Sequence, residues 1–258
     1  MNLFVLCKLA PDTVEELNVA AGDKSLDAEW LRYKLSDPDE HALEQALLLK
    51  EKCGGTVTVV ALDAPELDDA LFTALAKGAD RAVKFEGDFS LTQSGAAASI
   101  FAEFLAPGGQ ALPPDTLSLL RSQAIDDLEG EIGPFLAERL GVPYAGVVTR
   151  VTVQGAKVQV AKEFAGGTRG EFTLPLPAVL GIQSAERPPR YVPIAKVRAV
   201  MKSAKIQTVE PAGGELSPQV RVEKLYKPEA GHGARMLEGS PEEVAGQLVE
   251  ILAKQSLI

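Results

Sequence analysis

The feature that most constrains the fold is a regular alternation of short apolar runs with longer amphipathic segments. Residues 2–7 (NLFVLC) form a compact apolar run. Residues 39–55 then place apolar side chains at helical spacing, with acids early, lysines late and two glycines at the end. Such a pair is typical of a strand followed by a helix. The pairing recurs, with strands expected at 56–62, 81–85 and 114–120 and helices at 65–80, 91–106 and 130–143.

Strands that alternate with helices are joined by right-handed crossovers and run parallel. The predicted fold class is therefore α/β, with a doubly wound, mainly parallel sheet. In an open sheet of this kind, ligands bind beyond the carboxyl ends of the strands. The acidic, glycine-containing turn that follows residues 114–120 lies at that edge, so we expect it to contribute to a binding site.

The pattern changes in the second half of the chain. Residues 144–182 alternate polar and apolar side chains around QG and GG turns, which predicts an antiparallel hairpin extension and then a last buried strand. Residues 186–210 are punctuated by prolines and then basic, and we expect the core to be complete before them. Residues 240–255 begin with a capping box of Ser240 and Glu243 ahead of an apolar stripe, which predicts a helix on a C-terminal arm.

The formal net charge of −10 argues against nucleic acid or an anionic membrane as the main partner. The apolar run at the start has no basic residues before it and is too short for a signal peptide or membrane span, so we expect a cytoplasmic protein without membrane insertion. Cys7 and Cys53 are expected as reduced thiols. His41 and His232 make no ligand cluster, so no metal site is predicted.

Four segments carry a resemblance to a known family: DEHALEQALLLKEK (39–52), TALAKGADRAV (73–83), QAIDD with GPFLAERLGVP (within 123–143) and PPRYVPIAKVRAVMKSAK (188–205). In this order and spacing they resemble the small (beta) subunit of electron-transfer flavoproteins. Residues 222–254 resemble the end of the branch that serves trimethylamine-type dehydrogenases. The resemblance therefore covers nearly the whole chain.

The resemblance implies a heterodimer. The large (alpha) subunit holds the redox-active FAD, and the small subunit supports that flavin, usually carries a structural AMP and offers a loop to an electron-donating dehydrogenase. It also implies a fold like that of the adenine-nucleotide α-hydrolases, without bond-breaking catalysis or catalytic residues. On this basis residues 1–190 are expected to form the nucleotide-fold domain, and residues 191–258 a docking segment and an arm that wraps the partner subunit.

The family's AMP site is enclosed by the ends of the first two strands, a polar residue before the first helix and the turn that opens the fourth helix. The cofactor-binding residues carried over in this way are Leu6, Lys8, Ser36, Leu62, Arg121, Gln123, Asp126, Gly130, Glu131, Ile132 and Gly133. A carboxylate about 4 Å from a phosphate costs on the order of 1 to 4 kcal/mol. Glu131 therefore argues against AMP bound in the usual way, although Arg121 remains a candidate ligand for an anion.

From spacing alone, the acids of this turn have a simpler interpretation. Asp126 or Asp127 would cap the following helix, because acids at a helix start stabilise its dipole by roughly 0.3 to 1 kcal/mol each. This capping interpretation is the preferred one.

The flavin-facing positions implied by the resemblance fall at Thr13 and Pro38, and neither side chain can stack on a flavin as an aromatic would. The docking loop corresponds to Glu186, Arg187, Pro189, Arg190 and Tyr191, with Glu186 where relatives have an apolar anchor. Because an unpaired buried carboxylate is penalised, either the partner presents a cation or docking uses another surface. The alternative is that Arg187, Arg190 and Tyr191 pack and pair within the subunit.

Three functions stay open. The first is an electron-carrier subunit whose own AMP site is degenerate. The second is a bifurcating-type beta subunit with a second FAD in place of AMP, which the sequence IGP at 132–134 mildly favours. The third is a nucleotide-free scaffold or regulatory subunit.

Overall fold

The computed structural model describes residues 1–258 except 30, 91, 128–129, 212–221 and 229–232. The described residues form two compact units, Met1–Leu225 and Tyr226–Ile258. The domain boundary expected after residue 190 thus lies inside the first unit, since the chain from 191 to 225 belongs to it.

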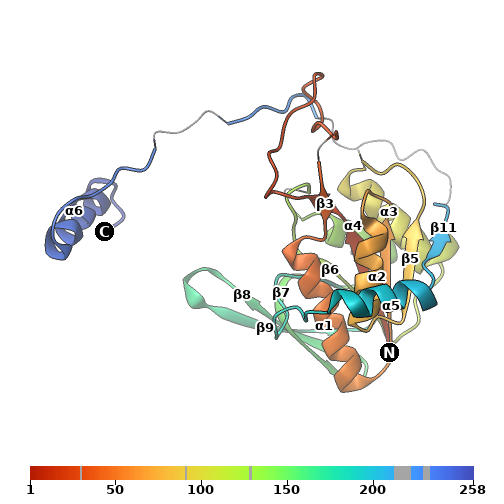
Figure 1. The fold of residues 1–258 in the computed structure, drawn as a ribbon. Helices are drawn as coiled ribbons and strands as arrows, with labels where there is room; N and C mark the ends of the chain where they lie inside the picture. Colours follow the sequence, from red (N-terminus) through yellow and green to blue (C-terminus); the bar gives the residue numbers. More distant parts are fainter. Residues whose placement is uncertain (30, 91, 128–129, 212–221, 229–232) are drawn as a thin grey trace. The chain divides into compact units, whose positions relative to one another are not determined.

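A nine-stranded sheet organises the first unit (Figure 1). Its order is β11-β5-β4-β1-β6-β10-β7-β8-β9. Neighbouring strands are parallel from β11 to β7, whereas the β7–β8 and β8–β9 pairs are antiparallel. The mainly parallel sheet with an antiparallel extension confirms the predicted fold class. The strands are β1 (Asn2–Lys8), β4 (Thr56–Leu62), β5 (Arg81–Phe85), β6 (Thr116–Arg121), β7 (Tyr144–Gln154), β8 (Lys157–Glu163), β9 (Arg169–Pro175), β10 (Ala178–Ile182) and β11 (Gln207–Val209); a small separate sheet pairs β2 (Ala10–Pro11) with β3 (Tyr33–Lys34).

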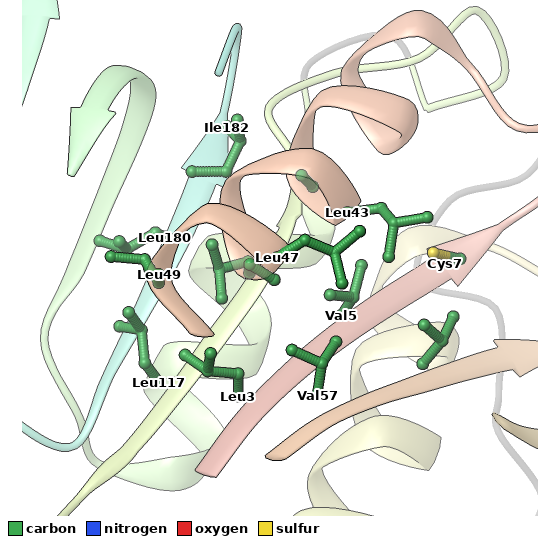
Figure 2. Close-up of a cluster of buried hydrophobic side chains, with 14 of the residues drawn as sticks. Leu3, Val5, Cys7, Leu43, Leu47, Leu49, Val57, Leu117, Leu180 and Ile182 are labelled. Atoms are coloured by element: carbon green, nitrogen blue, oxygen red, sulfur yellow. The ribbon is translucent and has the colours of Figure 1, made fainter. Parts of the chain in front are cut away.

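Helices cover both faces of the sheet, as a doubly wound fold requires. Alternate residues of β1 point to opposite sides, so Leu3 and Val5 pack with α1 and α2, whereas Leu6 packs with α3 and α4. Figure 2 shows the first of these clusters, with Leu43 and Leu47 of α1 over β1. The helices are α1 (Asp37–Cys53), α2 (Leu67–Lys77), α3 (Ser94–Leu105), α4 (Ile132–Leu140), α5 (Ile194–Ser203) and α6 (Pro241–Lys254), with short 3-10 turns η1 (Pro107–Gly109) and η2 (Ala165–Gly167).

The strand order reverses at the centre of the sheet. From β1 the chain crosses to β4 and then β5, but it returns through α3 to place β6 on the other side of β1. The carboxyl ends of β1 and β6, at Lys8 and Arg121, are therefore neighbours at the point where the sheet's connections diverge. This is the position at which ligands bind in open α/β sheets.

The expectation that the core ends before residue 186 is wrong, because two later elements, β11 and α5, pack on the fold. β11 adds to the main sheet by pairing with β5, and α5 packs on α2. Neither was predicted, because α5 buries no residue and β11 has only three residues. Their position depends on backbone pairing with an existing sheet edge, which residue patterns do not reveal.

The second unit contains α6. Ser240 caps it and forms the expected capping box with Glu243, which confirms the predicted helix. None of its residues is buried, and Leu248 and Leu252 of the apolar stripe are 47% and 38% exposed. Among the residues that the structure describes, no helix is long and apolar enough to cross a bilayer.

Candidate nucleotide site and docking segment

Arg121, the last residue of β6, is the centre of an ion-pair network at the divergence point of the sheet. Its side chain is only 2% exposed. The guanidinium lies 2.8 Å from Asp126, 3.1 Å from Asp127 and 3.3 Å from Asp39. It also donates to the backbone carbonyl of Lys8. Four of the five N–H donors of an arginine are thereby used within the chain.

The neighbours of Arg121 are themselves paired. Lys8 Nζ lies 2.6 Å from Asp126 Oδ2, and the Ser36 hydroxyl donates to Asp39 Oδ2 at 2.7 Å. Ser36 also caps α1 in a capping box with Asp39. The other oxygen of Asp39 is buried without a hydrogen-bond partner among the described residues. The network thus brings together Lys8, Ser36, Arg121 and Asp126 of the predicted site and adds Asp39 and Asp127.

Burial and charge act in opposite directions on this network. Burial raises the pKa of Asp39 despite the nearby guanidinium. Burial also opposes the charge of Arg121, but the three aspartates outweigh it and raise the pKa of Arg121 above its usual value. Arg121 therefore stays charged, and the chain's own carboxylates neutralise it. A phosphate at this guanidinium would have to compete with three carboxylates, so the residues present do not fit the phosphate of AMP.

The turn between β6 and α4 packs tightly on the strand end. Gly130 has φ +69°, and a Cβ at this position would lie 2.0 Å from the carbonyl oxygen of Ser122. Asp127 accepts a hydrogen bond from the backbone N–H of Ala124 at 2.7 Å. Glu131 stands at the N-cap of α4, half-buried, and makes no side-chain capping bond with the described residues.

The capping interpretation of the acidic turn is wrong for the two aspartates. Asp126 and Asp127 pair with Arg121, and no side chain among the described residues caps α4. A buried guanidinium offers these carboxylates a full positive charge, whereas a helix N-terminus offers only about half a charge. Leu128 and Glu129 of the same turn lie outside the described residues.

The remaining predicted residues lie apart from the network's charges. Leu6, Leu62 and Ile132 are core side chains that are at most 3% exposed. Gly133 leaves room for the ring of Tyr144, which a Cβ would approach to 2.6 Å. Burial, reinforced by the charge of Asp127, raises the pKa of Tyr144 to about 12.

A shallow pocket of about 340 Å³ borders the site. It is lined by Pro38, Gln123, Ala124, Ile125 and Gln183. The structure thus brings one expected flavin-facing residue, Pro38, beside one expected nucleotide residue, Gln123. The other flavin-facing residue, Thr13, is exposed in the loop after β2 and does not line this pocket.

The docking segment is tied to α1 by a row of hydrogen bonds. The backbone N–H groups of Ala185, Glu186 and Arg190 donate to His41 (3.1 Å), Gln45 (3.3 Å) and Glu44 (3.0 Å), respectively. The guanidinium of Arg190 also pairs with Glu44 at 2.8 Å and with Glu51 at 2.7 Å.

Two of the expected docking residues therefore form ion pairs inside the subunit. Glu186 pairs with Lys52 at 2.8 Å, and Arg190 with Glu44 and Glu51. Pro189 is half-buried, whereas Arg187 is exposed and Tyr191 is 86% exposed. Arg190 thus pairs within the subunit, whereas Tyr191 is exposed to solvent.

Comparison with known proteins identifies the family. The electron transfer flavoprotein domain matches residues 26–213. A protein of Clostridium acetobutylicum named electron transfer flavoprotein subunit beta is 30% identical over 253 residues, which are 96% of this chain and 90% of the relative. This chain belongs to the electron transfer flavoprotein family, among its beta subunits. Relatives of the same name in Bacillus subtilis and Methylophilus methylotrophus are each 28% identical, over 100% and 98% of both chains, respectively.

The match confirms the resemblance seen in the sequence. Since the relatives are named as electron-transfer subunits, this chain is a subunit of an electron-transfer flavoprotein and an electron carrier rather than an enzyme that breaks bonds. Asp39 and Glu44, the partners of Arg121 and Arg190, were not among the expected residues. The available signal was their spacing, because Asp39 stands four residues before Leu43 and Glu44 four residues before Leu48, which places both acids in line with buried leucines.

Glu44 is expected to be the main anchor of the docking segment in this flavoprotein subunit. Burial raises the pKa of Glu44, whereas the hydrogen bonds from Arg190 lower it. The hydrogen bonds prevail, so the pKa of Glu44 lies below its usual value. Replacing Glu44 with glutamine should therefore lower the free energy of unfolding by about 1.5 to 3 kcal/mol at pH 7. A carboxyl group whose pKa is lower in the folded than in the unfolded state stabilises the fold at pH values above the unfolded pKa. This stabilisation is lost as the pH falls through the folded pKa. The difference in free energy of unfolding between the native protein and Glu44→Gln should therefore narrow below about pH 4.

Denaturant unfolding at several pH values measures this difference. The matched control is Glu51→Gln, which removes the exposed partner of the same arginine and should cost no more than about 1 kcal/mol. Equal losses in the two variants, or a loss from Glu44→Gln that does not change with pH, would show that the buried pair is not the anchor.

Proposed function

We propose that this chain is the electron-carrier beta subunit of a heterodimer. In this proposal the alpha subunit holds the redox-active FAD, and the beta subunit supports that flavin and docks an electron-donating dehydrogenase. The support is the match to beta subunits along the whole chain, together with the doubly wound fold.

We further propose that the beta subunit's own AMP site is degenerate. The observation that carries this is the Arg121 network, in which Asp39, Asp126 and Asp127 occupy the guanidinium that a phosphate would need. Each carboxylate about 4 Å from a phosphate costs on the order of 1 to 4 kcal/mol. Such a penalty offsets much of what a helix N-terminus and a single lysine would contribute to binding.

In this proposal the beta subunit supports the flavin by packing against it, without aromatic stacking. Thr13 and Pro38, at the flavin-facing positions, can make van der Waals contact but cannot stack on the isoalloxazine.

We place the heterodimer in the cytoplasm, where Cys7 and Cys53 stay reduced, and both are free thiols in the structure. We assign contact with the alpha subunit mainly to the C-terminal arm, within the segment 191–258.

Counting cofactors in the purified heterodimer tests the proposal. After heat release, chromatography with mass detection should find one FAD and no AMP per heterodimer, because the three carboxylates exclude the phosphate. One AMP per heterodimer would contradict the degenerate site, and two FADs would identify the bifurcating type. A heterodimer without flavin would favour the scaffold and contradict the electron-carrier function.

A further inference from the structure

The carboxylate of Asp126 lies between two cations that come from different strands. Its Oδ2 is 2.6 Å from Lys8 Nζ at the end of β1, and its Oδ1 is 2.8 Å from Arg121 Nη2 at the end of β6. Each oxygen of this carboxylate therefore meets its own cation, as two oxygens of a bound phosphate would. The three groups meet at the divergence point of the sheet, where a ligand would contact the ends of both strands.

The turn that carries Asp126 is held in place by its neighbour, Asp127. One oxygen of Asp127 accepts from the backbone N–H of Ala124 at 2.7 Å, and the other accepts from Arg121 Nε at 3.1 Å. The backbone carbonyl of Asp127 accepts from the N–H of Gly130 at 3.1 Å. Asp126 instead bonds to Lys8 and Arg121, so its side chain can be removed while the bonds that shape the turn remain.

Asp126 also lies on the solvent side of the Arg121 network. The side chains of Asp126 and Lys8 are 17% and 14% exposed, whereas those of Arg121, Asp39 and Asp127 are at most 2% exposed. A small anion from solution could therefore reach the place of the Asp126 carboxylate without disturbing the inner part of the network.

The charges of the network leave room for one anion at this place. Lys8 and Arg121 are two cations, and Asp39 and Asp127 balance them from the inner side through Nη1 and Nε of the guanidinium. Asp126 is the remaining charge, and it bonds to Lys8 Nζ and Arg121 Nη2. Without Asp126 the other four groups sum to zero, and these two nitrogens lose the carboxylate that joins them. A buried or partly buried cation that loses its partner favours a replacement anion.

We propose that Lys8 Nζ and Arg121 Nη2 form an oxyanion subsite whose occupant is the chain's own Asp126 carboxylate, which takes the place of a bound phosphate. The proposal rests on the degenerate AMP site of the proposed function and deepens it, because it assigns the occupation of the subsite to one residue. The network joins β1, β6, the turn after β6 and, through Asp39, α1. The first unit is thereby held together from within, and the heterodimer assembles independently of the nucleotide concentration.

Asp126→Ala vacates the subsite in the intact heterodimer, and inorganic phosphate is the probe. Titration calorimetry in phosphate-free buffer should give the variant a Kd for phosphate at least about tenfold lower than that of the native heterodimer, because a carboxylate that repels phosphate is gone. Phosphate should also raise the Tm of the variant and leave that of the native heterodimer unchanged. Adding Lys8→Met to Asp126→Ala should return the Kd to within about twofold of the native value, since one of the two cations is lost.

The matched control is Asp12→Ala, which makes the same change in net charge and removes a carboxylate 2.9 Å from Lys34, outside the network. Equal phosphate affinities for Asp126→Ala and Asp12→Ala would overturn the inference. If Asp126→Ala does not assemble in phosphate-free buffer, added phosphate should restore the heterodimer, and a variant that phosphate cannot restore would equally overturn it.

The cofactor count keeps this inference separate from the proposed function. AMP in the native heterodimer would contradict the degenerate site on which the inference rests. One FAD and no AMP in the native heterodimer, together with an Asp126→Ala variant that gains no affinity for phosphate, would contradict only the oxyanion subsite.

Discussion

Replacing Arg121 with methionine is expected to lower the free energy of unfolding by about 3 to 5 kcal/mol at pH 7. Methionine keeps much of the side-chain volume but leaves Asp39, Asp126 and Asp127 close together without their shared cation. The side chains of Asp39 and Asp127 are 0% and 2% exposed, so water cannot take over the role of the guanidinium. Lys8 still pairs with Asp126, but no pair between Lys8 and the other two aspartates is present.

Urea unfolding of native protein and variant gives the difference directly. The loss should shrink at about pH 4 and below, because protonated aspartates no longer repel one another. Arg139→Met, in the exposed last turn of α4, is the control and should cost less than about 1 kcal/mol. A loss from Arg121→Met as small as that of the control would mean that the network does not stabilise the fold.

Deleting the residues after Ser217, which removes the second unit and the end of the first, is expected to abolish formation of the heterodimer while leaving the small subunit soluble. The second unit, Tyr226–Ile258, has too few residues to bury a core of its own, and Leu248, Val249 and Leu252 of α6 are exposed. The apolar stripe of α6 therefore needs a surface to cover it, and we assign that surface to the alpha subunit. Co-expression with the alpha subunit followed by size-exclusion chromatography measures the effect.

Point variants of α6 distinguish the contribution of its apolar stripe to heterodimer affinity from that of the length of the arm. Leu248→Asp/Leu252→Asp places charge on the apolar stripe and should weaken the heterodimer by at least about a hundredfold, since burying unpaired carboxylates is costly. Glu250→Ala, on the opposite side of α6, should leave affinity within about twofold. A truncated chain that still co-purifies with native affinity would show that the arm does not hold the partner.

Residue patterns alone were enough for the general architecture. The alternation of apolar runs and amphipathic segments predicted the parallel sheet, because each strand buries both faces and each helix one stripe. The capping box at Ser240 predicted the start of α6, because cap geometry depends on residues within one turn. The order and spacing of family segments likewise identified an electron-transfer flavoprotein subunit, which the comparisons confirmed.

Contacts between distant residues were decided only by the tertiary structure. Asp126 and Asp127 look like helix caps in the sequence, and they pair instead with Arg121, which also meets Asp39 from a helix 82 residues away in the chain. Arg190 looks like a docking residue, yet Glu44 and Glu51 hold it against α1. The reason is that local patterns record which groups are charged or apolar, whereas the pairing of a buried charge depends on which side chains the sheet order brings within hydrogen-bonding distance.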